Sequence, residues 1–328
     1  MAHLIESMFY LGETPWHGIG TPLKEVPTIE EALELAGMNF EVIKQPSTYR
    51  NPVTGMLCDT GGFTTVRLDT GDAIGNVGNR YTVLQNRDAF RPYDVLADFG
   101  YKLETAGVID GGKKIWILAK TPENFKVGDD EIRDYVLLYS SHDGSSGSAM
   151  RDVDIRVVCN NTLTWALNSK ANHEYKLRHT SSIGDKVNEL SANIKERKGN
   201  VAKAMDQMNR FHDYPLTPQE FEYYLEAVMP VLKNRHNKSI PELGITTRNR
   251  TQPVYDTITD LFFNGKGNRG RTLWDGYNAI TEYHDHEKKH NDWVKGTQFG
   301  DSYNKKRDAF RIASAMVENA PSTLITYN

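Results

Sequence analysis

The stretch YSSHDGSSGSAMRDVDIRVVCNNTLTWALN, residues 139–168, decides how the chain is organised. Its first part is too rich in serine and glycine for a buried strand and predicts a hydrogen-bonded turn. In residues 153–158, β-branched residues alternate with charged ones, which is the pattern of a half-buried strand. Asn160 and Asn161 then offer capping oxygens, so the sequence predicts a helix over residues 163–168.

A strand that leads into a helix N-terminus creates a place where an anion can bind. Unpaired N–H groups and the positive end of the helix dipole meet there. Arg151 and Arg156 lie just before this point, so they are candidates for holding a phosphate, with Asn160 or Asn161 capping the helix. The alternative is that the asparagines only cap, and that the arginines only solubilise the surface or pair with acids on neighbouring strands.

Upstream of this stretch, apolar residues alternate with period two and turn residues separate the runs. Residues 39–82 predict a three-stranded antiparallel meander, and residues 102–158 predict about four further strands. Thr28 with Glu31 forms a capping box for a short helix, and Asn86 can cap another helix. Strand-rich segments that each end in one helix predict an α+β fold with an antiparallel sheet.

Downstream, the apolar period becomes helical from residue 183 onward. Thr217 with Glu220 forms a second capping box in this part, whereas residues 169–182 are polar and indicate a linker. The predicted organisation is an N-terminal extension with a short helix (residues 1–38), an α+β nucleic-acid-binding domain (residues 39–180) and a mainly helical assembly domain (residues 183–328).

The overall composition excludes several classes of protein. The chain has 328 residues, of which 38% are hydrophobic and 25% charged, and it has no apolar run that can cross a bilayer. Its first residues are acidic and lack the cleavage site of a signal peptide, so we expect a cytoplasmic protein. Cys58 and Cys159 are too few for a disulfide framework or a thiolate metal site.

The charge is unevenly distributed. Residues 1–180 carry 18 Lys and Arg against 24 Asp and Glu, whereas the remaining residues carry 21 against 19. Neither part is strongly basic, so a nucleic-acid site has to be a local feature of the surface. The most basic segment, residues 233–271, includes a glycine-rich loop, for which solvent exposure is the ordinary interpretation.

Two candidate chemical sites are weak. His286 and His290 are one helical turn apart and can share a divalent ion, but His284 points elsewhere and no zinc-protease motif is present. Ser141-His142-Asp143 has the composition of a hydrolase triad, yet adjacent side chains on a loop point apart. No phosphate-binding or dinucleotide motif occurs either. We therefore predict no catalytic residue, no metal and no cofactor.

Six short motifs are spread over the chain. They are Trp16-His-Gly-Ile-Gly20, Val77-Gly-Asn-Arg-Tyr81, Glu104-Thr-Ala-Gly107, Ser141-His-Asp-Gly144, Arg156-Val-Val-Cys-Asn-Asn-Thr-Leu163 and Thr272-Leu-Trp-Asp-Gly-Tyr-Asn-Ala-Ile-Thr-Glu-Tyr283. Together they resemble a phage- and plasmid-borne family described only by a domain of unknown function. The expected strand order is also similar to that of single-strand annealing proteins of the Rad and RecT type, which bind DNA in a basic groove of oligomeric rings or filaments.

This resemblance implies a phage-type protein that binds and anneals single-stranded DNA in recombination or replication, without a cofactor and as a homo-oligomer. Such binding needs cations for the phosphates and flat side chains for the bases. The candidates are Arg67, Arg80, Lys113, Lys114, Arg151 and Arg156 for the phosphates, Tyr81 and Trp116 for the bases, and Asn160 and Asn161 beside them.

Two other functions stay open. The first is an interaction protein that inhibits a host defence enzyme, which the acidic balance of residues 1–180 favours. The second is an enzyme at the Ser141-His142-Asp143 loop, which ranks last because no base, nucleophile and orienting group can be assigned from their spacing.

Overall fold

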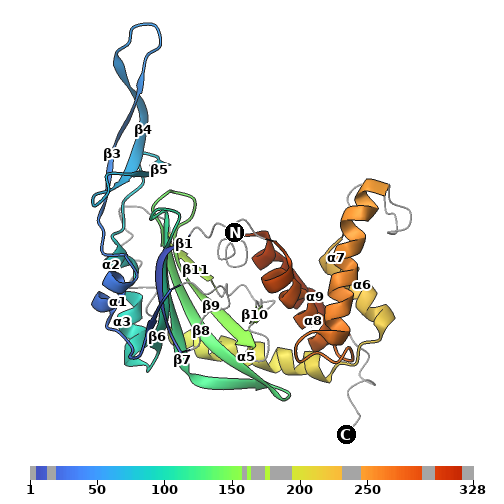
Figure 1. Ribbon diagram of the computed structural model, residues 1–328. Helices are drawn as coiled ribbons and strands as arrows, with labels where there is room; N and C mark the ends of the chain where they lie inside the picture. The colour runs from blue at the N-terminus through green and yellow to red at the C-terminus, as the bar shows by residue number, and fades with distance from the viewer. Residues whose placement is uncertain are drawn as a thin grey trace.

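An eight-stranded sheet forms the centre of the protein (Figure 1). The computed structural model describes residues 5–12, 20–156, 161–163, 174–177, 194–230, 245–289 and 300–319. The strand order is β10-β9-β8-β7-β6-β1-β2, with β11 also paired to β9. Within this sheet the pairing of β1 with β2 is parallel and the others are antiparallel. The strands are β1 (Ile5–Leu11), β2 (Thr21–Leu23), β6 (Lys102–Ile109), β7 (Lys114–Val127), β8 (Asp130–Ser141), β9 (Ser148–Arg156), β10 (Asn161–Leu163) and β11 (Glu174–Leu177).

Both faces of the central strands are buried, which explains the nearly continuous apolar runs in their sequences. Successive side chains of a strand point to opposite faces. On β8, Val136 accordingly packs on one face in a cluster with residues of two short helices, α1 (Ile29–Leu35) and α3 (Pro92–Asp98), and its neighbour Tyr135 packs on the other face with Trp116 of β7. A third short helix, α2 (Asn86–Ala89), lies between α1 and α3 in the sequence.

A second, three-stranded antiparallel sheet projects from the first (Figure 1). Its strands are β3 (Val42–Arg50), β4 (Leu57–Arg67) and β5 (Ala73–Val77), and we call these strands with their connecting turns the arm. The hairpin of β3 and β4 points away from the rest of the protein, and its tip exposes Val53 and Met56. The predicted meander is confirmed, although β3 and β4 are longer than their apolar alternation indicated.

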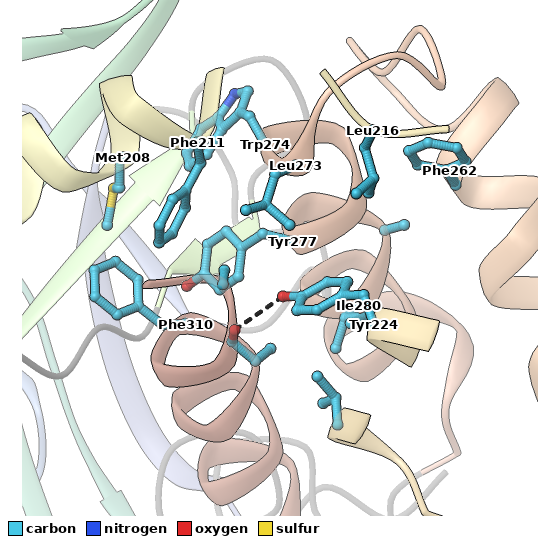
Figure 2. Close-up of a cluster of buried hydrophobic side chains, with 14 of the residues drawn as sticks. Met208, Phe211, Leu216, Tyr224, Phe262, Leu273, Trp274, Tyr277, Ile280 and Phe310 are labelled. Carbon is cyan, nitrogen blue, oxygen red and sulfur yellow. Dashed lines mark hydrogen bonds between the residues drawn. The ribbon is translucent and has the colours of Figure 1, made fainter. Parts of the chain in front are cut away.

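The C-terminal part of the chain is helical, as the sequence predicted. Its helices are α5 (Ile194–Asp213), α6 (Pro218–Val228), α7 (Ile245–Asn264), α8 (Leu273–Glu282) with its π-helical continuation η2 (Tyr283–Glu287), and α9 (Asp301–Glu318). They enclose an apolar cluster in which the rings of Phe211, Tyr277 and Phe310 lie 5.1–6.2 Å apart (Figure 2). The hydroxyl of Tyr224 donates to the Ala309 carbonyl at 2.9 Å, the dashed line in Figure 2. No helix in the described part of the chain is long and apolar enough to cross a membrane.

The predicted capping boxes are present. Thr28 accepts from the Glu31 N–H while the Glu31 side chain accepts from the Thr28 backbone, and Thr217 with Glu220 repeats this arrangement at α6. These reciprocal bonds satisfy N–H groups that a helix start leaves without a partner. Such local signals place the helix starts correctly because they depend only on residues three positions apart.

The far end of the β7–β8 hairpin enters the helical core. Val127 and Ile132 belong to the same buried cluster as the residues of α8 and α9. The indole N–H of Trp274 donates to the Asp130 carboxylate at 2.7 Å, and the Asn209 side chain accepts from the backbone N–H of Gly128 at 3.0 Å. The sheet and the helices are therefore joined by a shared apolar core and by polar contacts at its edge.

Two local predictions are wrong. Asn161 does not cap a helix, because residues 161–163 form β10, which pairs with the end of β9. The predicted linker over residues 169–182 contains β11, which pairs with the start of the same strand. Both short strands satisfy backbone groups on the outer edge of β9, a long-range need that local sequence does not reveal. Asn160 and residues 164–168 lie outside the described residues.

The expected cap at Asn86 is also wrong. The N-cap of α2 is Gln85, and Asn86 is the first residue of the helix. The Asn86 side-chain amide donates instead to the carbonyls of Met38 and Phe40, at 2.7 and 3.2 Å. Its capping chemistry is thus used to hold the segment that leads into the arm.

Candidate functional site

Arg67, a predicted phosphate contact, is buried at the end of β4 and pairs with two exposed carboxylates. It is 5% exposed, its guanidinium lies 2.7 Å from Asp69 and 2.9 Å from Glu6, and it covers the ring of Phe40 at 4.1 Å. The bond from Arg67 lowers the pKa of the Asp69 carboxyl. This arrangement explains the position of Arg67 as a link between the arm and β1.

Arg151, a second predicted phosphate contact, joins the sheet to the last helix. It is 3% exposed, and its guanidinium lies 4.2 Å from the ring centre of Tyr303 on α9 and 5.9 Å from that of Tyr139. Trp116, predicted to stack on bases, is 7% exposed and packs with Tyr139 in the apolar layer of the same face. In this fold the flat faces of both groups are covered by protein.

The remaining predicted cations differ in their surroundings. Lys113 is partly exposed and its ammonium lies 3.1 Å from the Asp110 carboxylate, whereas Lys114 is buried at the start of β7. Arg156 ends β9, where its backbone pairs with β8 and β10, and its side chain lies outside the described residues. Arg80 is exposed in the turn that follows β5.

The turn that carries Arg80 is fixed by contacts on both sides. The ammonium of Lys44 donates to the carbonyls of Asn79 and Tyr81, at 2.9 and 2.6 Å. The Tyr81 hydroxyl donates to the Ser141 carbonyl at 3.2 Å. Burial, with a smaller contribution from the charge of Asp143, raises the pKa of Tyr81 well above its ordinary value, so this hydroxyl remains a donor.

His142 holds three segments together below this turn. Its ring Nε2 lies 2.7 Å from the Asn86 Oδ1, its backbone N–H donates to the Lys113 carbonyl at 2.8 Å, and its carbonyl accepts from the Thr65 hydroxyl at 2.7 Å. The ring also meets Phe40 edge to face. His142 therefore connects the arm, α2 and β7.

The neighbours of His142 do not form a hydrolase triad with it. The Ser141 hydroxyl donates to the Ser146 carbonyl at 2.5 Å, and the Asp143 carboxylate accepts from the Ser145 N–H at 2.9 Å. A triad needs a chain of bonds from nucleophile to base to orienting acid. In the structure these bonds shape the loop between β8 and β9.

This loop is pressed against the arm. A Cβ atom on Gly75 would lie 2.3 Å from the Cα of Asp143, and one on Gly144 would lie 3.1 Å from the Val77 side chain. The motifs Val77-Gly-Asn-Arg-Tyr81 and Ser141-His-Asp-Gly144 are thus brought together in space, and we call the place where they meet the arm junction.

A groove of about 720 Å³ lies on the arm beside this junction. No residue that lines it is charged, and its polar groups are the side chains of Gln45, Ser47, Thr48, Thr60, Thr64 and Asn76. Asn76 and Val77, which also line it, end the strand that leads into the turn with Arg80. The groove can hold uncharged hydrogen-bonding groups, and the turn with the exposed Arg80 follows its lining residue Val77 in the chain. Sequence reasoning named Arg80 and Tyr81 but missed the groove, whose residues come from three strands.

The histidines considered for a metal lie elsewhere. His284 is buried and its Nδ1 lies 2.9 Å from the Ser302 hydroxyl, His286 is partly buried, and His290 lies outside the described residues. Among the residues that the structure describes, no group of three or more His, Cys, Asp or Glu could hold a metal ion.

Beside His284, Lys306 and Asp285 form an ion pair. The two charged atoms lie 2.7 Å apart and both side chains are fully buried. Burial lowers the pKa of Lys306, while the Asp285 charge acts in the opposite direction. The pair connects α9 to η2, and no sequence pattern indicated it.

The sequence profile of the family described as "Domain of unknown function (DUF932)" matches residues 73–314. No curated protein and no solved structure matches the chain. The profile match begins at β5 and ends in α9, so it includes the arm junction and the helical core. It agrees with the part of the resemblance that concerned a domain of unknown function.

Proposed function

Because the chain belongs to the DUF932 family, whose description gives no activity, we propose a function from the site itself: the protein binds single-stranded DNA at the arm junction. It does so as a homo-oligomer that anneals strands in phage-type recombination or replication, without a cofactor. The observation that carries this proposal is Arg80, exposed on a turn that Lys44 and Tyr81 hold and that follows Val77, a residue of the uncharged polar groove.

The chemistry of single-strand binding fits this arrangement. Such proteins contact the phosphates through cations and the bases through groups that tolerate many sequences. Arg80 supplies a guanidinium, which can donate two parallel hydrogen bonds to one phosphate. Since the net charge of the chain is −4, the attraction is local, and an oligomer multiplies it by placing one junction after another along the strand.

Fluorescence anisotropy of a labelled single-stranded oligonucleotide at a series of salt concentrations tests the proposal. We expect affinity to fall with salt, because each phosphate contact releases counterions, with a slope of about 0.7 per contact in a logarithmic plot. Arg80→Ala should weaken binding, and it should reduce the slope by the amount that corresponds to about one phosphate contact per protomer. Arg311→Ala is the matched control, because Arg311 is also exposed but lies on α9.

Two results reject the proposal. The first is that no oligonucleotide binds at low salt. The second is that the Arg80→Ala and Arg311→Ala proteins bind equally well, which would place any DNA contact away from the arm junction. A strand-annealing assay with the same two variants then tests whether binding at the junction serves annealing.

A second candidate function is that of an interaction protein which inhibits a host enzyme. The observation that favours it is the tip of the arm, where Val53, Met56 and Leu57 are 91%, 68% and 66% exposed. Apolar side chains gathered on a projecting hairpin are typical of surfaces that bind other proteins. A host protein retained after nuclease treatment, and lost from a Val53→Ser/Met56→Ser variant, supports this function. Retention by the variant rejects the tip as the binding surface.

A further inference from the structure

A row of polar side chains crosses the arm inside the groove. Thr64 on β4 is the register partner of Gln45 on β3 and of Asn76 on β5. Side chains of directly opposed residues share one face of a sheet. The hydroxyls of Ser47 and Thr64 lie 2.7 Å apart, and the Thr64 hydroxyl donates to the Asn76 Oδ1 at 3.4 Å. Two amides and two hydroxyls are therefore ordered side by side.

These contacts determine which groups can bind a ligand. Since the Asn76 Oδ1 accepts from Thr64, its Nδ2 remains to donate. Gln45 is exposed and its side chain forms no hydrogen bond within the described part of the chain, so its amide can both donate and accept. The row therefore offers the amide N–H groups of Asn76 and Gln45 as donors and the Gln45 amide oxygen as an acceptor. Both residues lie on strands that pair with β4.

The absence of charge in the lining limits the ligand. A phosphate or carboxylate placed in this groove would give up water without meeting a cation there. A flat, uncharged group that carries a donor beside an acceptor suits it better. Adenine has this pattern on its N6 and N7 edge, which asparagine and glutamine side chains bind through two hydrogen bonds. A duplex presents this edge in its major groove, and in a single strand the whole base can also turn out of the stack to meet a shallow protein groove.

We propose that the groove is a base-reading subsite that prefers adenine, with Gln45 and Asn76 as the residues that contact the base edge. This inference rests on the proposed function, in which Arg80 holds a neighbouring phosphate. Asn76 and Arg80 lie on either side of the end of β5, so one nucleotide strand can meet both. The subsite adds a sequence preference to a contact that is otherwise indifferent to sequence.

The test compares labelled oligonucleotides of equal length that contain only adenine or only thymine, at one salt concentration. We expect the wild-type protein to bind the adenine strand about five- to tenfold more tightly, which is the lower end of the roughly 1–3 kcal/mol for one good amide-to-adenine contact. Gln45→Ala/Asn76→Ala should remove this ratio and leave the salt dependence unchanged. Asn124→Ala, which removes an exposed amide on β7 outside the groove, should keep the ratio.

The outcomes separate this inference from the proposed function. The subsite is wrong if both strands bind without an adenine preference, or if the Gln45→Ala/Asn76→Ala variant keeps the preference. In either case, strand binding stands as long as the salt dependence still depends on Arg80. If neither strand binds, adenosine is titrated into the protein while the side-chain amide signals of Gln45 and Asn76 are followed by NMR. If those signals shift, the groove binds adenine although the protein does not bind a strand. If they do not change, the subsite is overturned.

Discussion

Replacing Arg67 with alanine tests whether this residue is part of the structure or part of a DNA site. The substitution removes hydrogen bonds to Glu6 and Asp69 and the contact of the guanidinium with the Phe40 ring. The two carboxylates are 41% and 44% exposed, so they return to water when their partner is lost. The cost is therefore below the roughly 5 kcal/mol that an uncompensated buried charge can reach.

The expected magnitude follows from the contacts that disappear. Hydrogen bonds to charged groups contribute about 1.5–3 kcal/mol, and a cation over an aromatic ring adds about 0.5–2 kcal/mol. Since these contacts overlap, Arg67→Ala should lower the free energy of unfolding by about 2–4 kcal/mol. The stability of Arg67→Lys should lie between that of the wild type and that of Arg67→Ala, because an ammonium cannot donate to both carboxylates in the geometry of a guanidinium.

Urea denaturation followed by tryptophan fluorescence measures the change, with Arg311→Ala as a control expected within about 0.5 kcal/mol of wild type. The pH dependence gives a second readout. Because Arg67 lowers the pKa of Asp69 in the folded state, the stabilisation is present above the ordinary carboxyl range and is lost as the pH falls through the lowered value. The difference between wild type and Arg67→Ala should therefore shrink in acid.

The refuting result is a variant that unfolds like the wild type but binds the oligonucleotide less tightly. Arg67 would then contact phosphate, as the sequence predicted, and the ion pairs with Glu6 and Asp69 would contribute nothing measurable. Reduced stability with unchanged binding per folded molecule supports the structural explanation.

Three further predictions concern other contacts. Gly75→Ala should cost about 1–3 kcal/mol of stability and expose the arm to proteolysis, because its Cβ would collide with the Asp143 backbone. Gly78→Ala, with open space around it, should behave like the wild type, and equal cleavage of the two variants would contradict the close contact. Lys306→Met should lower stability by about 3–5 kcal/mol in urea melts, since it leaves the buried Asp285 carboxylate without its ammonium partner. Adding Asp285→Leu should recover part of the loss, and additive costs of the two changes would speak against coupling of the two side chains. Thr217→Ala should cost about 1 kcal/mol through loss of the α6 cap, with Thr217→Ser close to wild type; no change in melting would mean that this helix start contributes little.

Local patterns predicted the architecture because each depends on residues close in sequence. Alternation located β6 to β9 and the arm, and the capping boxes located the starts of α1 and α6. The short strands β10 and β11 were missed because they form only where β9 offers an open edge. With three and four residues, they are also too short for a periodic pattern to identify them.

The site was predictable only in part. A basic residue in a strand is equally consistent with a phosphate contact and with a buried ion pair, and the deciding partner of Arg67 lies 61 residues away. Arg80 was predicted to lie on or beside the strands of the meander, and it lies in the turn that follows β5, whereas burial of Arg151 depends on α9. The groove needed the register between three strands, which the sequence of each strand does not fix.

The hairpin of β7 and β8 also constrains the order in which parts of the protein can fold. During synthesis its tip, with Val127 and Ile132, leaves the ribosome well before the helices that cover it, and Asp130 precedes its partner Trp274 by 144 residues. Closing so long a loop is entropically costly and tends to be a late event in folding. Until then the tip exposes apolar side chains that other nascent chains can bind, so a chaperone can protect the chain at this step.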